Sequence, residues 1–136
     1  MSKISGPLLD RIDIHIEVPA VPFKELSADR GGTSSADMRS LVVAARAIQS
    51  QRLAGSRTRY NAQMSSRQIR TFCKLTEECQ NLLRDSVNNL GLSARAHDKV
   101  LRVARTIADL DNSEVITANH INEATNYRML DRQMWT

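Results

Sequence analysis

The sequence predicts an all-α fold, a bundle of four to five helices that follows an N-terminal segment of different character. Apolar residues recur at helical spacing from residue 35 onward, and a Ser or Thr precedes most of the predicted helix starts. Hydrophobic residues make up 41% of the chain but aromatic residues only 4%, which predicts an aliphatic core. The length of 136 residues fits one ordinary domain.

The first 33 residues predict a strand and a linker rather than a helix. Apolar and polar residues alternate from Ile12 to Val18 (IDIHIEV), as in a strand with one buried face. We find no second convincing strand, and a lone strand cannot satisfy its own backbone groups. We therefore expect this strand to belong to a larger α/β core outside the sequence. Residues 27–35 (SADRGGTSS) are typical of a linker, so residues 1–33 are expected to be mobile and disordered in the isolated chain.

The first helix is expected from about Ser35 to Leu53, with Ser34 or Ser35 as its N-cap. Its apolar stripe consists of Met38, Leu41, Val42, Ala45 and Ile48. A short second helix is expected at about residues 66–74, where Ile69, Phe72 and Cys73 are the buried positions.

Three further helices follow, each with a predicted N-cap and an apolar stripe. Their expected bounds are Thr76 to Leu90 with Gly91 as the stop, Ser93 to Leu110, and Thr117 to Leu130. The helical domain is thus expected at residues 34–132, and residues 133–136 are expected to form a frayed tail.

The fourth predicted helix has an apolar face and an opposite cationic face. The cationic face holds Arg95, Lys99, Arg102 and Arg105. Arg102 can pair with Asp98 at i−4, and Arg105 with Asp109 at i+4. Arg95 stands in the first turn, where the helix dipole disfavours a cation and free N–H groups favour an anion. The residues alone leave two interpretations of Arg95 open, a phosphate site or an ion pair with Asp98.

Arg11 precedes the predicted strand and lies between Asp10 and Asp13. One interpretation is a local charge cluster at the edge of the strand. The other is an arginine presented at a subunit edge to the phosphate of another molecule. The residues alone do not decide between them.

A window without any Asp or Glu extends from Met38 to Thr76 and holds seven arginines and one lysine. The whole chain carries a net charge of +4. The window indicates a polyanionic partner or an acidic protein surface, and an ordinary solvated face is the alternative. The candidate nucleic-acid contacts are Arg39, Arg46, Arg57, Arg59, Arg67 and Arg70.

The cysteines and histidines form no recognisable catalytic or metal-binding set. Cys73 and Cys79 lie six residues apart and are expected to be buried free thiols rather than a disulfide or a metal pair. His15, His97 and His120 are scattered and are expected to be structural or solvated. A GxxxxGK[ST] phosphate loop does not occur in the sequence. We expect no metal site and no cofactor bound to this chain alone.

Three stretches of the sequence, in this order, resemble a known family. They are SGPLLDRIDIHIEVP at residues 5–19, GLSARAHDKVLRVARTIADL at residues 91–110, and ITANHINEATNYR at residues 116–128. The sequence resembles the C-terminal part of the magnesium chelatase-related AAA+ ATPases of the YifB/ComM type. The resemblance extends from about Lys3 to Met134.

The resemblance implies that the helical bundle is an AAA+ lid and that the phosphate loop and the Walker B carboxylates lie upstream of residue 1. Arg11 in LLDR matches the arginine finger, which would act on a neighbouring subunit's nucleotide. Arg95 in LSAR matches the sensor-2 arginine. ATP and Mg²⁺ are the implied cofactors of the full-length protein, and the upstream core and neighbouring subunits of a ring are its implied partners. The isolated chain is expected to be a monomer without ATPase activity.

Magnesium chelatase proper inserts magnesium into porphyrin, whereas relatives of the present type look like bacterial motors that act on DNA in competence and recombination. The implied function is therefore a lid that couples ATP hydrolysis to remodelling, with DNA as the candidate substrate. The alternative is a free-standing helical nucleic-acid-binding module that needs no ATP. The sequence has no apolar run of roughly 18 residues and no visible signal peptide, so we expect a cytoplasmic protein without a membrane partner.

Overall fold

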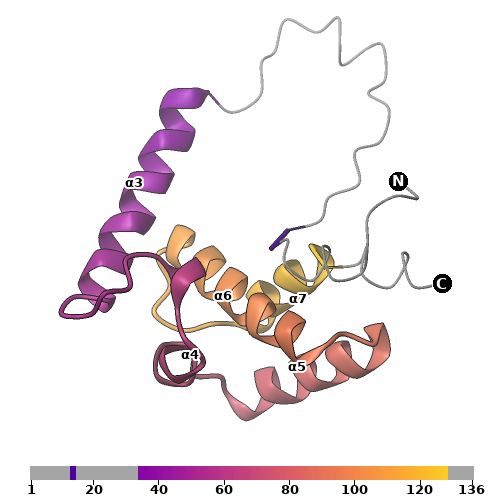
Figure 1. Ribbon diagram of the computed structural model, residues 1–136. Helices are drawn as coiled ribbons and strands as arrows, with labels where there is room; N and C mark the ends of the chain where they lie inside the picture. Colours follow the sequence, from indigo (N-terminus) through magenta and orange to yellow (C-terminus); the bar gives the residue numbers. More distant parts are fainter. Residues whose placement is uncertain (1–12, 15–33, 129–136) are drawn as a thin grey trace, which may run out of the picture.

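The structure, a computed structural model, describes residues 13–14 and 34–128 (Figure 1). In this part of the chain the fold is all-α, as predicted. Asp13 and Ile14, the two described residues of the expected strand, lie in neither a strand nor a helix. The rest of that strand, residues 27–33 of the linker and the expected frayed tail lie outside the described residues, and Ser35 of the linker segment begins α3.

Five α-helices and one short 3-10 helix make up the described part of the bundle. They are α3 (Ser35–Arg52), η1 (Asn61–Gln63), α4 (Ser66–Phe72), α5 (Glu77–Leu90), α6 (Ala94–Leu110) and α7 (Ala118–Asn126). All five predicted helices are present. α7 ends at Asn126 rather than near Leu130, and η1 lies where no helix is predicted.

Side-chain caps explain where these helices begin. The hydroxyl of Ser34 accepts a hydrogen bond from the Asp37 amide, and the hydroxyl of Thr76 accepts one from the Cys79 amide. Gly91 ends α5 with a φ of 63°, a left-handed conformation that a glycine adopts without steric cost. Helix starts and stops are local features, which is why the sequence predicts them well.

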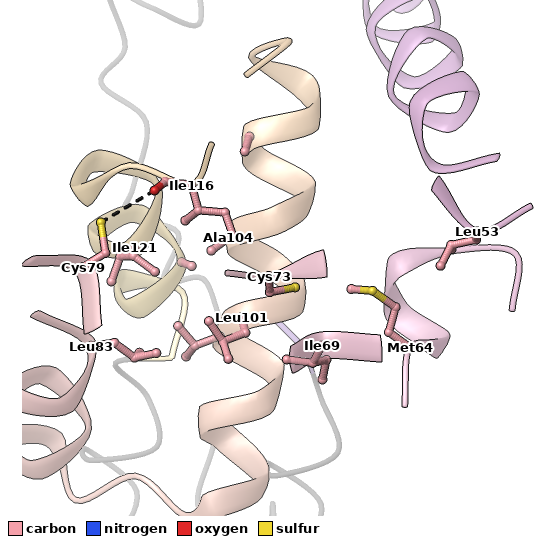
Figure 2. Close-up of a cluster of buried hydrophobic side chains, with 13 residues drawn as sticks. Leu53, Met64, Ile69, Cys73, Cys79, Leu83, Leu101, Ala104, Ile116 and Ile121 are labelled. Atoms are coloured by element: carbon pink, nitrogen blue, oxygen red, sulfur yellow. Dashed lines mark hydrogen bonds between the residues drawn. The ribbon is translucent and has the colours of Figure 1, made fainter. Parts of the chain in front are cut away.

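Helix α6 is the centre of the bundle and packs against α7, α3, η1 and α4. Its small residues Ala96, Ala104 and Ala108 are fully buried, which lets the neighbouring elements approach closely. Figure 2 shows the aliphatic cluster around it. The buried members are Leu53, Met64, Ile69, Cys73, Cys79, Leu83, Val100, Leu101, Ala104, Ala108, Ile116, Ile121 and Ala124.

Both cysteines are buried free thiols, as predicted. The Cys79 thiol lies 3.6 Å from the Ile116 carbonyl oxygen, the contact drawn as a dashed line in Figure 2. Burial raises the pKa of the Cys73 thiol to about 11, although the nearby guanidinium of Arg105 acts in the opposite direction. Both side chains therefore belong to the packed core.

The apolar stripe of α3 exists, but most of it is not part of the core. Met38, Leu41 and Val42 are 52%, 52% and 50% exposed, whereas Ala45 is buried. Figure 1 shows the reason: α3 reaches the bundle with its C-terminal end, and its N-terminal half projects away from it. Spacing along the helix predicts the stripe, but it cannot predict how much of the stripe another element covers.

Candidate functional site

Arg95 lies in the first turn of α6, at the edge of the bundle. The hydroxyl of Ser93 caps the helix by accepting a hydrogen bond from the Ala96 amide at 3.1 Å. Ala96 and Val100 are fully buried, so the start of the helix is anchored while the Arg95 side chain is exposed. The position therefore combines a fixed helix N-terminus with a solvent-facing cation.

Arg95 forms no hydrogen bond or ion pair with any residue in the described ranges. The alternative partner, Asp98, is engaged elsewhere: it accepts a hydrogen bond from the Ser66 hydroxyl at 3.2 Å. An oxygen of the same carboxylate lies 3.4 Å from Nδ1 of His97. The i+3 ion pair that the sequence leaves open is therefore not formed, and the guanidinium is available to a ligand.

The other cations of α6 do not face solvent freely, although they lie on the cationic face that the sequence predicts. Arg105 pairs with Asp109 at i+4 as predicted, but it is only 4% exposed. Arg102 donates two hydrogen bonds to the Met64 carbonyl oxygen, at 2.8 and 3.1 Å, rather than pairing with Asp98. The physical reason is that α6 lies at the centre of the bundle. Its cationic face is therefore covered by the chain around Met64 and by residues 113–114.

A buried polar network joins the C-terminal ends of α3 and α6. The Asp109 side chain has no exposed surface and accepts hydrogen bonds from both terminal nitrogens of Arg52, at 2.6 and 2.9 Å. It also accepts hydrogen bonds from Nε of Arg105 at 3.2 Å and from the Asn61 amide at 2.8 Å. One carboxylate thus serves two guanidinium groups, with an uncharged amide beside them.

The second guanidinium of this network is held by backbone oxygens as well. Arg105 donates to the carbonyl oxygens of Ser113 and Glu114, at 2.6 and 3.0 Å. Burial lowers the pKa of Arg105 from its ordinary value, and the Asp109 carboxylate acts against that shift. The N–H groups of Arg105 are thus occupied. The network connects α3 and the loop after α6 to the bundle, and its role is structural.

The six candidate nucleic-acid contacts are all exposed. Arg39 and Arg46 lie on α3, Arg57 and Arg59 in the loop after it, and Arg67 and Arg70 on α4. Arg46 stacks on the Tyr60 ring at 3.6 Å from the ring centroid, so its side chain is partly immobilised. Arg52, a further cation of the same window, is used internally by Asp109.

The remaining residues that the sequence analysis considered either have structural roles or lie outside the described residues. His120 caps α7: its Nδ1 accepts a hydrogen bond from the Thr117 amide, and its Nε2 lies 2.9 Å from the Asp111 carboxylate. Arg11 and His15 lie outside the described residues. In the described ranges no group of three or more His, Cys, Asp or Glu side chains could hold a metal ion.

Comparison with protein families gives two matches that together span most of the chain. The family described as magnesium chelatase, subunit ChlI C-terminal, matches residues 32–128. The family described as magnesium chelatase, subunit ChlI, matches residues 1–26, which include Arg11. The chain therefore belongs to the magnesium chelatase subunit ChlI C-terminal family.

Within this family, the curated relatives that the chain matches are proteins of the YifB/ComM type. It is 44% identical to the protein YifB of Escherichia coli (strain K12) and 42% identical to competence protein ComM of Haemophilus influenzae, each over 97% of this chain. YifB of Salmonella typhimurium is 38% identical, also over 97% of the chain. The chain spans about a quarter of the length of these relatives, 26%, 25% and 26% respectively.

No helix in the described part of the chain is both long and apolar enough to cross a membrane.

The role of Asn61 and the pairing of Arg52 with Asp109 do not follow from the sequence. The two charged residues are 57 positions apart, and no local pattern joins them. One signal was available: Asp109 stands beside Ala108 on a helix whose other residues are mainly apolar or basic, an unusual place for a carboxylate. Such a position suggests a buried partner, but the sequence does not identify which arginine supplies it.

Proposed function

We propose that this chain is the lid of an AAA+ ring ATPase, and that it couples ATP hydrolysis to the remodelling of DNA. Arg95 acts as the sensor-2 arginine that contacts the nucleotide γ-phosphate. Arg11 acts as an arginine finger on the nucleotide of a neighbouring subunit. The observation that carries the proposal is the exposed Arg95 guanidinium, which has no partner in the described ranges and stands at a capped helix start.

The chemistry of a phosphate suits this position on two counts. The first turn of α6 has backbone N–H groups without helical partners, and the helix dipole favours negative charge there. A guanidinium adds a full positive charge and up to five N–H donors. The buried residues that follow Arg95 fix the helix, so that a contact at its start would move the whole lid with the nucleotide.

ATP and Mg²⁺ are proposed as cofactors of the full-length protein on the strength of the family. The described residues meet part of that requirement. Arg95 can bind phosphate, but no group of three or more His, Cys, Asp or Glu side chains among them could hold a metal ion. Magnesium would neutralise charge on the transferred phosphate, held by residues outside the described ranges. The share of this chain is to bind and orient the γ-phosphate.

A free-standing nucleic-acid-binding module is the second candidate function. The six exposed arginines favour it, since they lie in a window that has no acidic residue. Such a module would bind DNA equally well with and without ATP, whereas a ring motor would depend on the nucleotide. Measuring DNA binding by the full-length protein with and without ATP discriminates between the two.

The proposal is tested by Arg95→Ala in the full-length protein. ATP turnover should fall by at least about tenfold, because a lost contact to transition-state charge costs more than 1 kcal/mol of barrier. The matched control is Arg67→Ala, which removes another exposed arginine side chain and should leave turnover unchanged when ATP hydrolysis is measured without DNA. Thermal unfolding of both variants should match the parent. Parental turnover in Arg95→Ala, or loss of the fold, would refute the sensor role.

A further inference from the structure

A groove of about 880 Å³ opens between α4 and α5, over the N-terminal half of α6. Its floor is apolar and consists of the buried side chains of Ile69, Leu83 and Leu101, each from a different helix. Figure 2 shows these three side chains in a row along one edge of the core. Ile69, Leu83 and Leu101 are only 3%, 2% and 6% exposed, so the apolar surface that a ligand meets also includes the half-buried Leu75 and Val87, which line the groove.

The rim of the groove is cationic. Arg70 and Lys74 line it at the C-terminal end of α4, and Arg84 lines it on α5. All three residues are exposed. The acidic lining residue is Asp98, which is half-buried and already accepts a hydrogen bond from Ser66. The groove thus combines an apolar floor with an excess of positive charge at its edges.

We propose that this groove binds an acidic amphipathic helix of a partner protein. Leucine-type side chains of that helix would enter between α4 and α5 and contact Leu83 and Leu101. Glu or Asp residues flanking them would pair with Arg70, Lys74 and Arg84. The volume of the groove accommodates the few side chains on one face of a short helix.

The apolar floor of the groove favours a protein helix over a nucleic acid as the partner. A phosphate backbone would meet cations only at the rim and would leave the aliphatic floor uncovered. Single-stranded bases stack on aromatic side chains, and none of the lining residues is a Phe, Tyr or Trp. This interaction surface is separate from the proposed nucleotide contact, because binding here requires neither ATP nor Arg95.

Fluorescence anisotropy with the 136-residue chain tests the proposal. The probe is a fluorescein-labelled helical peptide of roughly four turns, with leucines at i, i+3, i+4 and i+7 and glutamates beside them. We expect micromolar binding that weakens at least about tenfold in Arg70→Glu and in Arg84→Glu. The matched control is Arg67→Glu, the same charge reversal at an exposed α4 residue that does not line the groove. It should weaken binding less than about twofold.

Two further measurements separate the groove from general charge attraction. A scrambled peptide of the same composition should bind at least about tenfold more weakly. Amide shifts of Leu83, Val87 and Leu101 should move on titration with the leucine-striped peptide. Circular dichroism should show that each variant keeps the parental helix content. Equal binding of both peptides, or equal effects of Arg67→Glu and Arg70→Glu, would each overturn the proposal.

Discussion

Asp109 is the residue on which the junction between α3 and α6 depends. Its carboxylate is fully buried and accepts hydrogen bonds from Arg52, Arg105 and Asn61. Two guanidinium groups pair with this one carboxylate, and no second carboxylate of the network could replace it. A buried charge is tolerated only when it is paired and hydrogen-bonded, and here the pairing of both arginines passes through one side chain.

We therefore expect Asp109→Ala to lower the free energy of unfolding by about 3 to 5 kcal/mol, because it leaves two buried cations without their acid. Urea denaturation followed by circular dichroism measures the loss. The control is Asp85→Ala on α5, an exposed aspartate, for which a change within about 0.5 kcal/mol is expected. A loss below about 1 kcal/mol for Asp109→Ala would mean that water or backbone oxygens replace the carboxylate.

Cys73 makes the free energy of unfolding depend on pH in the alkaline range. Burial raises the pKa of its thiol from the ordinary value of 9.0 to about 11, so the unfolded chain releases this proton at a lower pH than the folded chain does. The contribution to stability is therefore constant below pH 9 and is lost as the pH rises toward 11. Its size is roughly 2 to 3 kcal/mol.

Unfolding of the parent and of Cys73→Ala, measured in urea at pH 8 and pH 11, tests this expectation. The alanine variant starts less stable because it leaves a small cavity, but it should lose less stability between the two pH values. An equal loss in both proteins would show that Cys73 does not contribute to the alkaline transition.

At the scale of single elements, α3 differs from the other helices. Its C-terminal half is joined to the bundle through Ala45, Gln49 and Arg52, whereas the apolar residues of its N-terminal half are exposed. Side chains that remain in contact with water contribute little burial energy to the folded state. The N-terminal half of α3 is thus held by its own helical hydrogen bonds and by its continuity with the packed half.

Leu41→Gln and Val42→Gln should each change the free energy of unfolding by no more than about 0.5 kcal/mol. The contrasting variant is Leu83→Ala in the core, which should cost about 2 to 5 kcal/mol. Chemical denaturation of the 136-residue chain compares the three. A loss above about 1.5 kcal/mol for Leu41→Gln would indicate that this face is covered in solution.

At the scale of the whole molecule, the arginines separate into a structural set and a surface set. Arg52, Arg105 and Arg128 are largely buried, and the first two hold the junction at Asp109. The six arginines predicted as nucleic-acid contacts remain exposed, although Arg46 is stacked on Tyr60. Because some arginines pair with Asp109 inside the bundle, the basic surface is smaller than the sequence alone suggests.

If this basic surface contacts DNA, binding of the 136-residue chain to a duplex should be weak and should fall steeply as salt is raised. Arg59→Ala should weaken binding and reduce the slope of log K against log salt by about one, as expected for a lost phosphate contact. Arg84→Ala, outside the acid-free window, is the control and should leave the slope unchanged. Absence of binding even at low salt would identify the window as a solvated face.

The local features of the molecule can be predicted from the residues beside them. The capping hydroxyls of Ser34, Thr76 and Ser93, and the left-handed stop at Gly91, all lie next to the helices that they bound. Position in a helix also follows from local spacing, so the sequence alone placed Arg95 in the first turn of α6. Capping and periodicity act over about four residues, which is why these predictions hold.

What each side chain of a helix contacts depends on the packing of elements that are far apart in the sequence. Arg105 and Arg95 stand on the same predicted cationic face, yet one is buried against Asp109 and the other is exposed. The Arg52–Asp109 pair spans 57 positions, and the groove over Leu83 is lined by residues of α4, α5 and α6 that lie far apart in the sequence. Such contacts depend on the packing of distant elements, since burial and charge pairing are set by three-dimensional neighbours and not by spacing along one helix.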